Sequence, residues 1–153
     1  MDRPGSHRLR LGRRSIAGQP YHVRFTTRGR APLLASLSAG RVVARALRAA
    51  EKRRQATTLC FVVMPDHVHW LLELGTRAPL FAVVGAVKGR TSRELVRILP
   101  GLPKGPWQPG YFDRAIRREE DVAAVARYIV ANPVRAGLVP SVRAWPHWDA
   151  IWL

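Results

Sequence analysis

The sequence predicts an α+β fold in which a four-stranded antiparallel sheet carries helices on one face and a further helix follows toward the C-terminus. Segments that alternate apolar and polar residues, as strands do, are interleaved with segments of helical periodicity. The chain has 153 residues, 47% of them hydrophobic, which is the size and composition of one domain with one core.

The first strand is expected at residues 21–27, where Tyr21, Val23 and Phe25 alternate with polar side chains. Residues 36–54 then change to a helical pattern, with an apolar stripe opposite a basic one. The basic stripe could follow a phosphate backbone, although a charged stripe is also typical of any surface helix. Both interpretations stay open from the sequence alone.

Residues 57–64 and 67–74 are predicted to form a hairpin. Both segments are rich in β-branched and apolar residues, and a Pro-Asp pair separates them. In the second arm His67 and His69 share one face of the strand, because side chains alternate in direction. The two imidazoles are therefore expected to project side by side.

A second helix is predicted over residues 79–99, followed by a loop at 103–110 and a short strand at 111–117. A third helix is expected to open on the acidic residues Glu119, Glu120 and Asp121, which suit the positive end of the helix dipole. It is expected to end at Asn132, because a following proline disfavours helical geometry at the preceding residue.

This order of strands and helices is the ferredoxin-like plan. We divide the chain into a basic, flexible N-terminal arm (1–19), a main folded domain (20–140) and a Trp-rich C-terminal tail (141–153). The tail contains Trp145, Trp148 and Trp152. We expect these rings to anchor the C-terminus to the core, with base binding as the alternative.

The charge of the chain points to a polyanionic partner. There are 26 Lys and Arg residues against 10 Asp and Glu, a formal net charge of +16, and nearly all the basic residues are Arg. An arginine fork grips phosphate with two donors and stacks on bases. An Arg-rich genome would replace Lys by Arg without creating so large a net charge. We therefore expect a nucleic-acid partner.

Several classes of protein are excluded. Cys60 is the single cysteine, so neither an internal disulfide nor a Cys-rich zinc site can form. No segment approaches the 18 or so apolar residues of a membrane span, and the basic N-terminus lacks the apolar core of a signal peptide. A phosphate-binding Gly-Lys-Ser/Thr loop is missing, so we expect no nucleotide cofactor. The predicted location is the cytoplasm.

Two pairs of residues could carry chemistry. His67 and His69, about 7 Å apart at Cα on one strand face, can bind one divalent ion, although most such pairs in a basic protein are structural or solvent-facing. Tyr128 and Asn132 lie one turn apart on the third helix, where they offer a phenolic nucleophile and an oxygen ligand. The alternative for Tyr128 is a partly buried ring whose hydroxyl is bonded to backbone.

Separated motifs occur in a characteristic order: YHV at 21–23, MPDHVH at 64–69 and YIVANPVRAGL at 128–138, with KG at 88–89, WQ at 107–108 and YFD at 111–113 between them. From about Tyr21 to Val139 the chain resembles the REP-associated tyrosine transposases. These are domesticated relatives of the single-tyrosine HUH transposases of insertion sequences.

The resemblance implies that His67 and His69 are the HUH metal ligands, Tyr128 is the nucleophile and Asn132 occupies the third-ligand position. Insertion-sequence relatives usually have Gln there, and Asn is one methylene shorter, so ligation through water is an alternative. The positions one turn either side of the tyrosine hold Ala124 and Asn132, which argues against the two-tyrosine relaxases and replication initiators. The implied cofactor is Mg²⁺ or Mn²⁺.

The expected function is that of a metal-dependent endonuclease and strand transferase acting on single-stranded or hairpin DNA of the REP type. Tyr128 would attack the scissile phosphate, giving a 3′ hydroxyl and a 5′-phosphotyrosine link, with Asp113 as a candidate assistant. Alternatives are a non-catalytic hairpin-binding protein and a ferredoxin-like RNA-binding module, although the RNP1 pattern of the latter is missing.

Affinity for DNA is expected from basic and aromatic side chains, with bases stacking on rings such as Trp107 or Tyr111. The candidate residues are Arg24, Arg28, Arg41, Arg45, Lys88, Trp107, Tyr111, Arg114 and Arg135. Binding should weaken steeply with salt. We expect a monomer, with a dimer as the alternative.

Overall fold

The computed structural model describes residues 15–117 and 120–152 and contains one five-stranded sheet in the order β4-β1-β3-β2-β5. All four pairings between neighbouring strands are antiparallel. The strands are β1 (Pro20–Thr26), β2 (Ala56–Val63), β3 (His67–Leu74), β4 (Phe112–Ala115) and β5 (Trp148–Ala150). The first four follow the predicted ferredoxin-like plan, and the fifth corrects the prediction of four.

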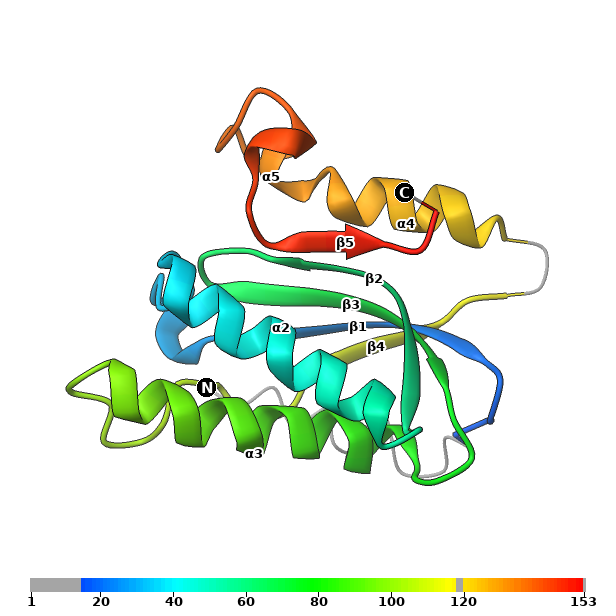
Figure 1. Cartoon of the computed structure of the whole chain (residues 1–153), viewed down its shortest axis with the longest axis horizontal. Helices are drawn as coiled ribbons and strands as arrows, with labels where there is room; N and C mark the ends of the chain where they lie inside the picture. Colours follow the sequence, from blue (N-terminus) through cyan, green and yellow to red (C-terminus); the bar gives the residue numbers. More distant parts are fainter. Residues whose placement is uncertain (1–14, 118–119, 153) are drawn as a thin grey trace.

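Helices lie on both sides of this sheet (Figure 1). α2 (Leu37–Lys52) and α3 (Leu80–Ile98) cover one face, as predicted, while α4 (Val122–Val130) lies on the other, where it packs against β2 and β5. One-turn helices or turns complete the chain: η1 (Arg28–Arg30), α5 (Asn132–Arg135) and η2 (Val142–Ala144). We call the two surfaces of the sheet the α2/α3 face and the α4 face.

The α2/α3 face holds the larger core. The Ser36 hydroxyl caps α2 by accepting the backbone N–H of Ala39 at 3.2 Å. The predicted apolar stripes of both helices are buried against Val23, Phe25, Trp70 and Leu72 of the sheet. Hydrophobic periodicity thus predicted these helices and the surface that they bury.

The third predicted helix is divided in two. Asp121 caps α4 through the backbone N–H of Ala124, and the helix ends at Val130 rather than at Asn132. Asn132 opens the separate helix α5, whose first turn accommodates Pro133 because the proline needs no donor there. The prediction that Tyr128 and Asn132 share one helix is therefore wrong. The predicted Glu119 and most of the predicted arm, up to residue 14, lie outside the described residues.

The C-terminal tail adds β5 at the edge of the sheet. Trp145 donates its indole N–H to the Val63 carbonyl at 3.0 Å, and both Trp145 and Trp148 pack against the smaller core under α4. The expected anchoring role is confirmed for these two rings, whereas Trp152 is largely exposed. Cys60 is buried in the same core. Among the described residues, no helix is long and apolar enough to cross a bilayer.

Candidate active site

The sheet register brings three histidines onto the α4 face. His67 and His69 lie on β3, and His69 is paired across the ladder with Arg24 of β1. His22, two residues before Arg24, is paired with Leu71, whose side chain packs in the core under α4. Because residues two apart on a strand and residues directly opposite share a face, all three imidazoles lie on the α4 side. The predicted juxtaposition of His67 and His69 is confirmed.

A continuous chain of hydrogen-bonding groups joins these rings. Asp66 Oδ1 lies 2.6 Å from His67 Nδ1, and His22 Nε2 lies 2.9 Å from His69 Nδ1. Between them, the Nε2 atoms of His67 and His69 face each other at 3.1 Å. Each histidine of the pair is therefore anchored through Nδ1 and directs Nε2 toward the same point.

Burial and neighbouring charges keep the imidazoles neutral. Burial, helped by the charges of His67 and His22, lowers the pKa of His69 to about 3. Burial, helped by Arg114 and Arg24, lowers the pKa of His22 to about 4. The pKa of His67 is lowered by burial too, although Asp66 opposes the shift. Neutral imidazole is the form that binds a metal ion.

The geometry of the pair fits a divalent ion. The two Nε2 atoms lie 3.1 Å apart, near enough to bind one divalent ion together, and each imidazole is held through Nδ1. If Nε2 carries the lone pair, each Nδ1 carries the proton and donates it outward, His67 to Asp66 and His69 to His22. Among the described residues, no group of three or more His, Cys, Asp or Glu side chains is arranged to hold a metal.

Tyr128 lies on the exposed side of α4, with 66% of its surface accessible. The Arg135 guanidinium covers its ring at 3.7 Å from the centroid and also donates to the Tyr128 carbonyl. The positive charge of Arg135 contributes to the lowered pKa of His69, so Arg135 lies within electrostatic range of that histidine. The alternative of a partly buried tyrosine is wrong, because the ring is exposed.

Asn132 is half-buried at the start of α5, where its Nδ2 donates to the Ile129 carbonyl at 2.7 Å. This bond fixes the amide, with Oδ1 as the atom that could ligate an ion. Within the described part of the chain, neither Asn132 nor Tyr128 makes a hydrogen bond or ring contact to the histidines. Their predicted roles stay predictions.

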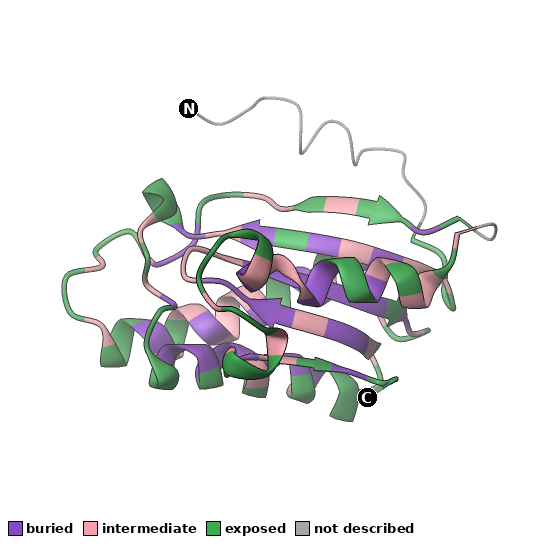
Figure 2. Cartoon of the chain, turned by 90° about the horizontal axis from the view of Figure 1, so that it is seen from above, coloured by how far each residue is buried: buried purple, intermediate pink, exposed green. Residues whose placement is uncertain are grey.

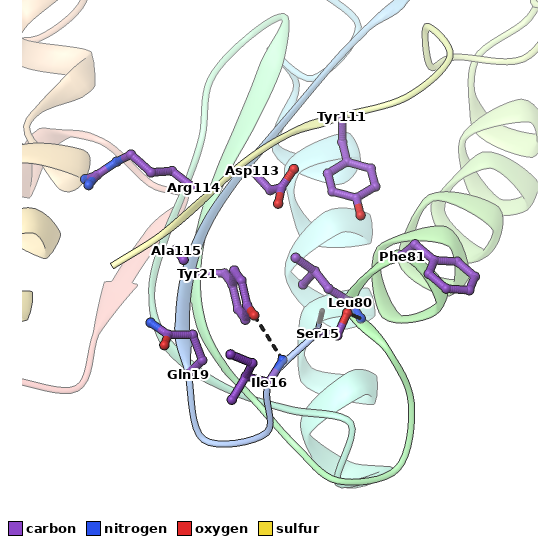
Figure 3. Close-up of a pocket in the computed structure, with 10 residues that line it drawn as sticks. All are labelled: Ser15, Ile16, Gln19, Tyr21, Leu80, Phe81, Tyr111, Asp113, Arg114 and Ala115. Carbon is purple, nitrogen blue, oxygen red and sulfur yellow. Dashed lines mark hydrogen bonds between the residues drawn. The ribbon is translucent and has the colours of Figure 1, made fainter. Parts of the chain in front are cut away.

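Asp113 is on the wrong side of the sheet to assist Tyr128. It is paired with Val23, which is buried in the core of the α2/α3 face, so both side chains lie on that face. Figure 3 shows Asp113 with Tyr111 and Phe81 around a cavity of about 380 Å³. The prediction that Asp113 assists catalysis is therefore wrong, and Tyr111 lies on the same distant face.

Trp107 is a core residue, which corrects its predicted role as a stacking platform. Only 6% of it is exposed, its indole N–H donates to Thr91 Oγ1 at 2.9 Å, and its ring packs edge-on against Phe25. Nearby, Lys88 donates to the carbonyls of Gln108 and Gly110 at 3.0 and 2.7 Å. Both residues hold the loop before β4 in place.

Two of the predicted DNA-binding arginines lie across the sheet from the histidines, and a third binds the loop before β4. Arg41 and Arg45 are on α2, across the sheet from the α4 face, and Arg45 pairs with Glu94 at 3.3 Å. Arg28 donates to the Lys104 carbonyl at 3.0 Å. Arg24 and Arg114, by contrast, lie on the α4 face beside His22, as their pairing shows.

Sequence reasoning missed three residues of this site: His22, Asp66 and Phe112. His22 lies two residues before Arg24 in a strand that the ferredoxin-like order places beside β3, so that order combined with strand alternation could have found it. Asp66 directly precedes His67 in the sequence, and its carboxylate contacts the His67 ring. Phe112 lies beside His22, with the two ring centroids 6.4 Å apart. The sequence could not place it, because the alternation of a four-residue strand does not show which side chains face which side of the sheet.

Comparison with known proteins gives consistent results. The family of IS200-like transposases matches residues 15–132. A REP-associated tyrosine transposase of Escherichia coli K12 is 33% identical over 86 residues, 56% of this chain and 49% of the relative. A Haemophilus influenzae protein, provisionally given the same name, is 29% identical over 99 residues, 59% of this chain and 56% of the relative. This chain therefore matches only about half the length of these relatives.

The fold has a solved counterpart of the same kind. The structure of a REP-associated tyrosine transposase bound to a REP hairpin superposes with a TM-score of 0.73 and 25% sequence identity, covering 89% of this chain and 79% of the other. The family match spans the strands that carry the three histidines and the helix that carries Tyr128. The chain belongs to the IS200-like transposase family, and REP-associated tyrosine transposases are among its relatives.

Proposed function

We propose that this protein is a metal-dependent endonuclease and strand transferase that acts on hairpin DNA with single-stranded flanks, through a 5′-phosphotyrosine intermediate. The observation that carries the proposal is the pair of Nε2 atoms 3.1 Å apart, each imidazole anchored at Nδ1 by Asp66 or His22. An exposed tyrosine covered by an arginine lies on the same face of the sheet.

His67 and His69 would hold Mg²⁺ or Mn²⁺, with the Asn132 amide oxygen, directly or through water, as a third contributor. The ion would supply Lewis-acid stabilisation of charge on the scissile phosphate. The protein's part is to keep both imidazoles neutral and correctly oriented, and the Asp66–His67 and His22–His69 contacts serve this purpose.

Tyr128 would act as the nucleophile. Its phenolic oxygen forms a bond to phosphorus while the bond from phosphorus to the 3′ oxygen breaks. The phenolic proton is lost to solvent, and the leaving 3′ oxygen takes up a proton from solvent to become the 3′ hydroxyl. Arg135 places a positive charge beside the phosphate under attack. A later 3′ hydroxyl reverses the step and joins new strands, so no nucleotide cofactor is needed.

Two facts support DNA as the partner. The net charge of +16 favours a polyanion, and the solved relative is bound to a REP hairpin. We propose that this chain acts on a REP-type hairpin as a monomer, in the cytoplasm where chromosomal DNA is accessible. The substrate, the oligomeric state and the location are part of this proposal, because the sequence matches cover only about half of each relative.

The test is formation of a covalent adduct. Hairpin DNA with labelled single-stranded flanks, incubated with the protein and Mn²⁺, should give a protein-linked fragment in a denaturing gel. Tyr128→Phe should abolish the adduct, at least a thousandfold, while the affinity for DNA stays within about twofold because the ring is retained.

His67→Ala should remove the adduct and the dependence on Mn²⁺ together. Arg41→Ala, a change on the other face of the sheet, is the matched control and should leave the adduct intact. Binding of the hairpin without any adduct, over a panel of flanking sequences, would contradict the enzymatic proposal and favour a non-catalytic hairpin-binding protein.

A further inference from the structure

Part of the α4 face is left uncovered by the helix. α4 packs against β2 and β5, at one side of the sheet. Among the residues that the structure describes, no helix packs on this face of the opposite edge, which is formed by β1 and β4. In Figure 2, which looks onto this face, the β4 edge is coloured mostly as exposed. The side chains on this uncovered edge are Arg24, Phe112 and Arg114, and we call them the edge platform.

Phe112 is the aromatic centre of the edge platform. It is 47% exposed, and its ring meets the edge of His22 at 6.4 Å between centroids. Arg24, directly opposite in the ladder, places its guanidinium 5.1 Å from the Phe112 centroid. An exposed phenylalanine beside an arginine offers the flat apolar surface and the cation that an unpaired nucleobase and its phosphate can bind.

The charge around Phe112 is positive. Among the described residues, Arg24 has no carboxylate partner, while Arg114 is held by both oxygens of Glu120 at 2.9 Å. The arginine charges act on the histidines as well, since Arg24 and Arg114 contribute to the lowered pKa of His22. A polyanion is therefore attracted to the ring rather than repelled from it.

The edge platform is close enough to the histidines to act on the same strand of DNA. Phe112 lies on β4, His22 on β1 and His69 on β3, and neighbouring strands are about 4.8 Å apart, so Phe112 lies roughly 10 Å from His69. One or two nucleotides of extended single-stranded DNA span this distance.

We propose that Phe112 and Arg24 form a stacking site for one unpaired nucleobase of single-stranded DNA, one or two nucleotides from the scissile phosphate. The site deepens the proposed function and rests on it for the position of the phosphate. The base lies flat on Phe112, and Arg24 binds the adjoining phosphate. Trp107 and Tyr111, the rings that the sequence favoured, are on the other face or buried.

Stacking is measured without cleavage. The probe is a set of hairpins with single-stranded flanks that carry 2-aminopurine at successive positions, bound by the Tyr128→Phe protein in EDTA. Fluorescence of one flanking position should be quenched on binding. Phe112→Ala should remove this quenching and weaken binding roughly tenfold, and Phe112→Trp should restore both.

Phe81→Ala is the matched control, because Phe81 is another exposed phenylalanine (66%), on α3 and across the sheet. It should change neither quenching nor affinity. The proposal is overturned if Phe112→Ala leaves quenching unchanged, or if Phe81→Ala weakens binding as much. Tighter binding of the matching RNA would overturn the assignment to DNA, and a loss of dimer in Phe112→Ala without loss of DNA binding would assign the ring to a second copy.

This readout separates the two proposals. If the wild-type protein forms no adduct with Mn²⁺ but quenching depends on Phe112, the stacking site stands and the nuclease proposal fails. If the adduct forms and quenching does not depend on Phe112, the nuclease proposal stands and the stacking site is overturned.

Discussion

The two faces of the sheet are built on different physical terms. On the α2/α3 face, two helices cover the strands, and a buried polar group such as the Trp107 indole N–H finds a partner in Thr91. On the α4 face one helix covers only part of the sheet, and the remainder carries histidines, arginines and an exposed ring. Burial of apolar area accounts for the first face. The second keeps polar groups at a half-covered surface where a ligand can reach them.

The largest effect on the α4 face is expected for the affinity for Mn²⁺ when Asp66 is changed. Asp66→Asn replaces a carboxylate by an amide that holds the His67 Nδ1 proton less strongly, so affinity for Mn²⁺ should fall about 10- to 100-fold. Isothermal titration with Mn²⁺ in the absence of DNA measures it. Arg30→Ala is the control, since Arg30 contacts the other carboxylate oxygen at 3.2 Å and its loss should change affinity less than threefold or so.

His22 should show the same dependence on its hydrogen bond to His69. His22→Ala removes the acceptor for the His69 Nδ1 proton, and His22→Gln can restore one. Affinity for Mn²⁺ should therefore fall about tenfold or more in the first variant and recover in part in the second. Equal affinities in wild type and both variants would mean that His22 only fills space.

The α2/α3 face can be destabilised by a substitution at a glycine of α2. A Cβ at Gly40 of α2 would lie 2.2 Å from the buried His147 ring, so Gly40→Ala should lower the free energy of unfolding by about 1 to 3 kcal/mol. Gly85→Ala on α3 meets nothing within 4 Å and should raise it by up to about 1 kcal/mol, since alanine favours helix. Urea denaturation measures both.

A second change checks the cause. In the pair Gly40→Ala with His147→Ala, the clash is gone, so the double variant should be more stable than the sum of the two single effects. If the losses in the free energy of unfolding were additive, the effect of Gly40→Ala would not come from a clash with His147.

The sequence predicted the structure of the α2/α3 face better than that of the α4 face. Helical periodicity predicted the buried stripes of α2 and α3, and strand alternation placed His67 and His69 together. The sequence could not tell which face of the sheet Asp113 lies on. In a four-residue strand this depends on how the strand pairs with its neighbour. β5 is three residues long and shows no period at all. Such features depend on tertiary pairing rather than on local pattern.

The histidines should make stability depend on pH in the metal-free protein. The pKa values of His69 and His22 are lowered to about 3 and about 4, so the unfolded chain, with a pKa near 6.5, binds more protons. Their contribution is fully present above about pH 6.5 and is lost as the pH falls toward 4. Each group can contribute up to about 1.4 kcal/mol per pH unit within that window.

Urea denaturation between pH 7 and pH 4 measures this slope. His22→Gln removes one titrating group and should make the slope shallower. His147→Gln removes another buried ring whose pKa is lowered by burial and should act in the same direction. A slope that is identical in wild type and His22→Gln would contradict the burial argument.

The smallest expected effect compares arginines on the two faces. Arg24→Ala should weaken binding of single-stranded DNA a few-fold and reduce the slope of log affinity against log salt by about one, because one phosphate contact is lost. Arg41→Ala and Arg45→Ala, on α2, should leave that slope unchanged, although the basic stripe suggested a role for both. Filter binding over a range of NaCl concentrations decides. Equal losses of affinity in all three variants would mean that DNA wraps around the edge of the sheet and contacts the basic stripe of α2 as well. The two faces would then differ in catalysis but not in DNA binding.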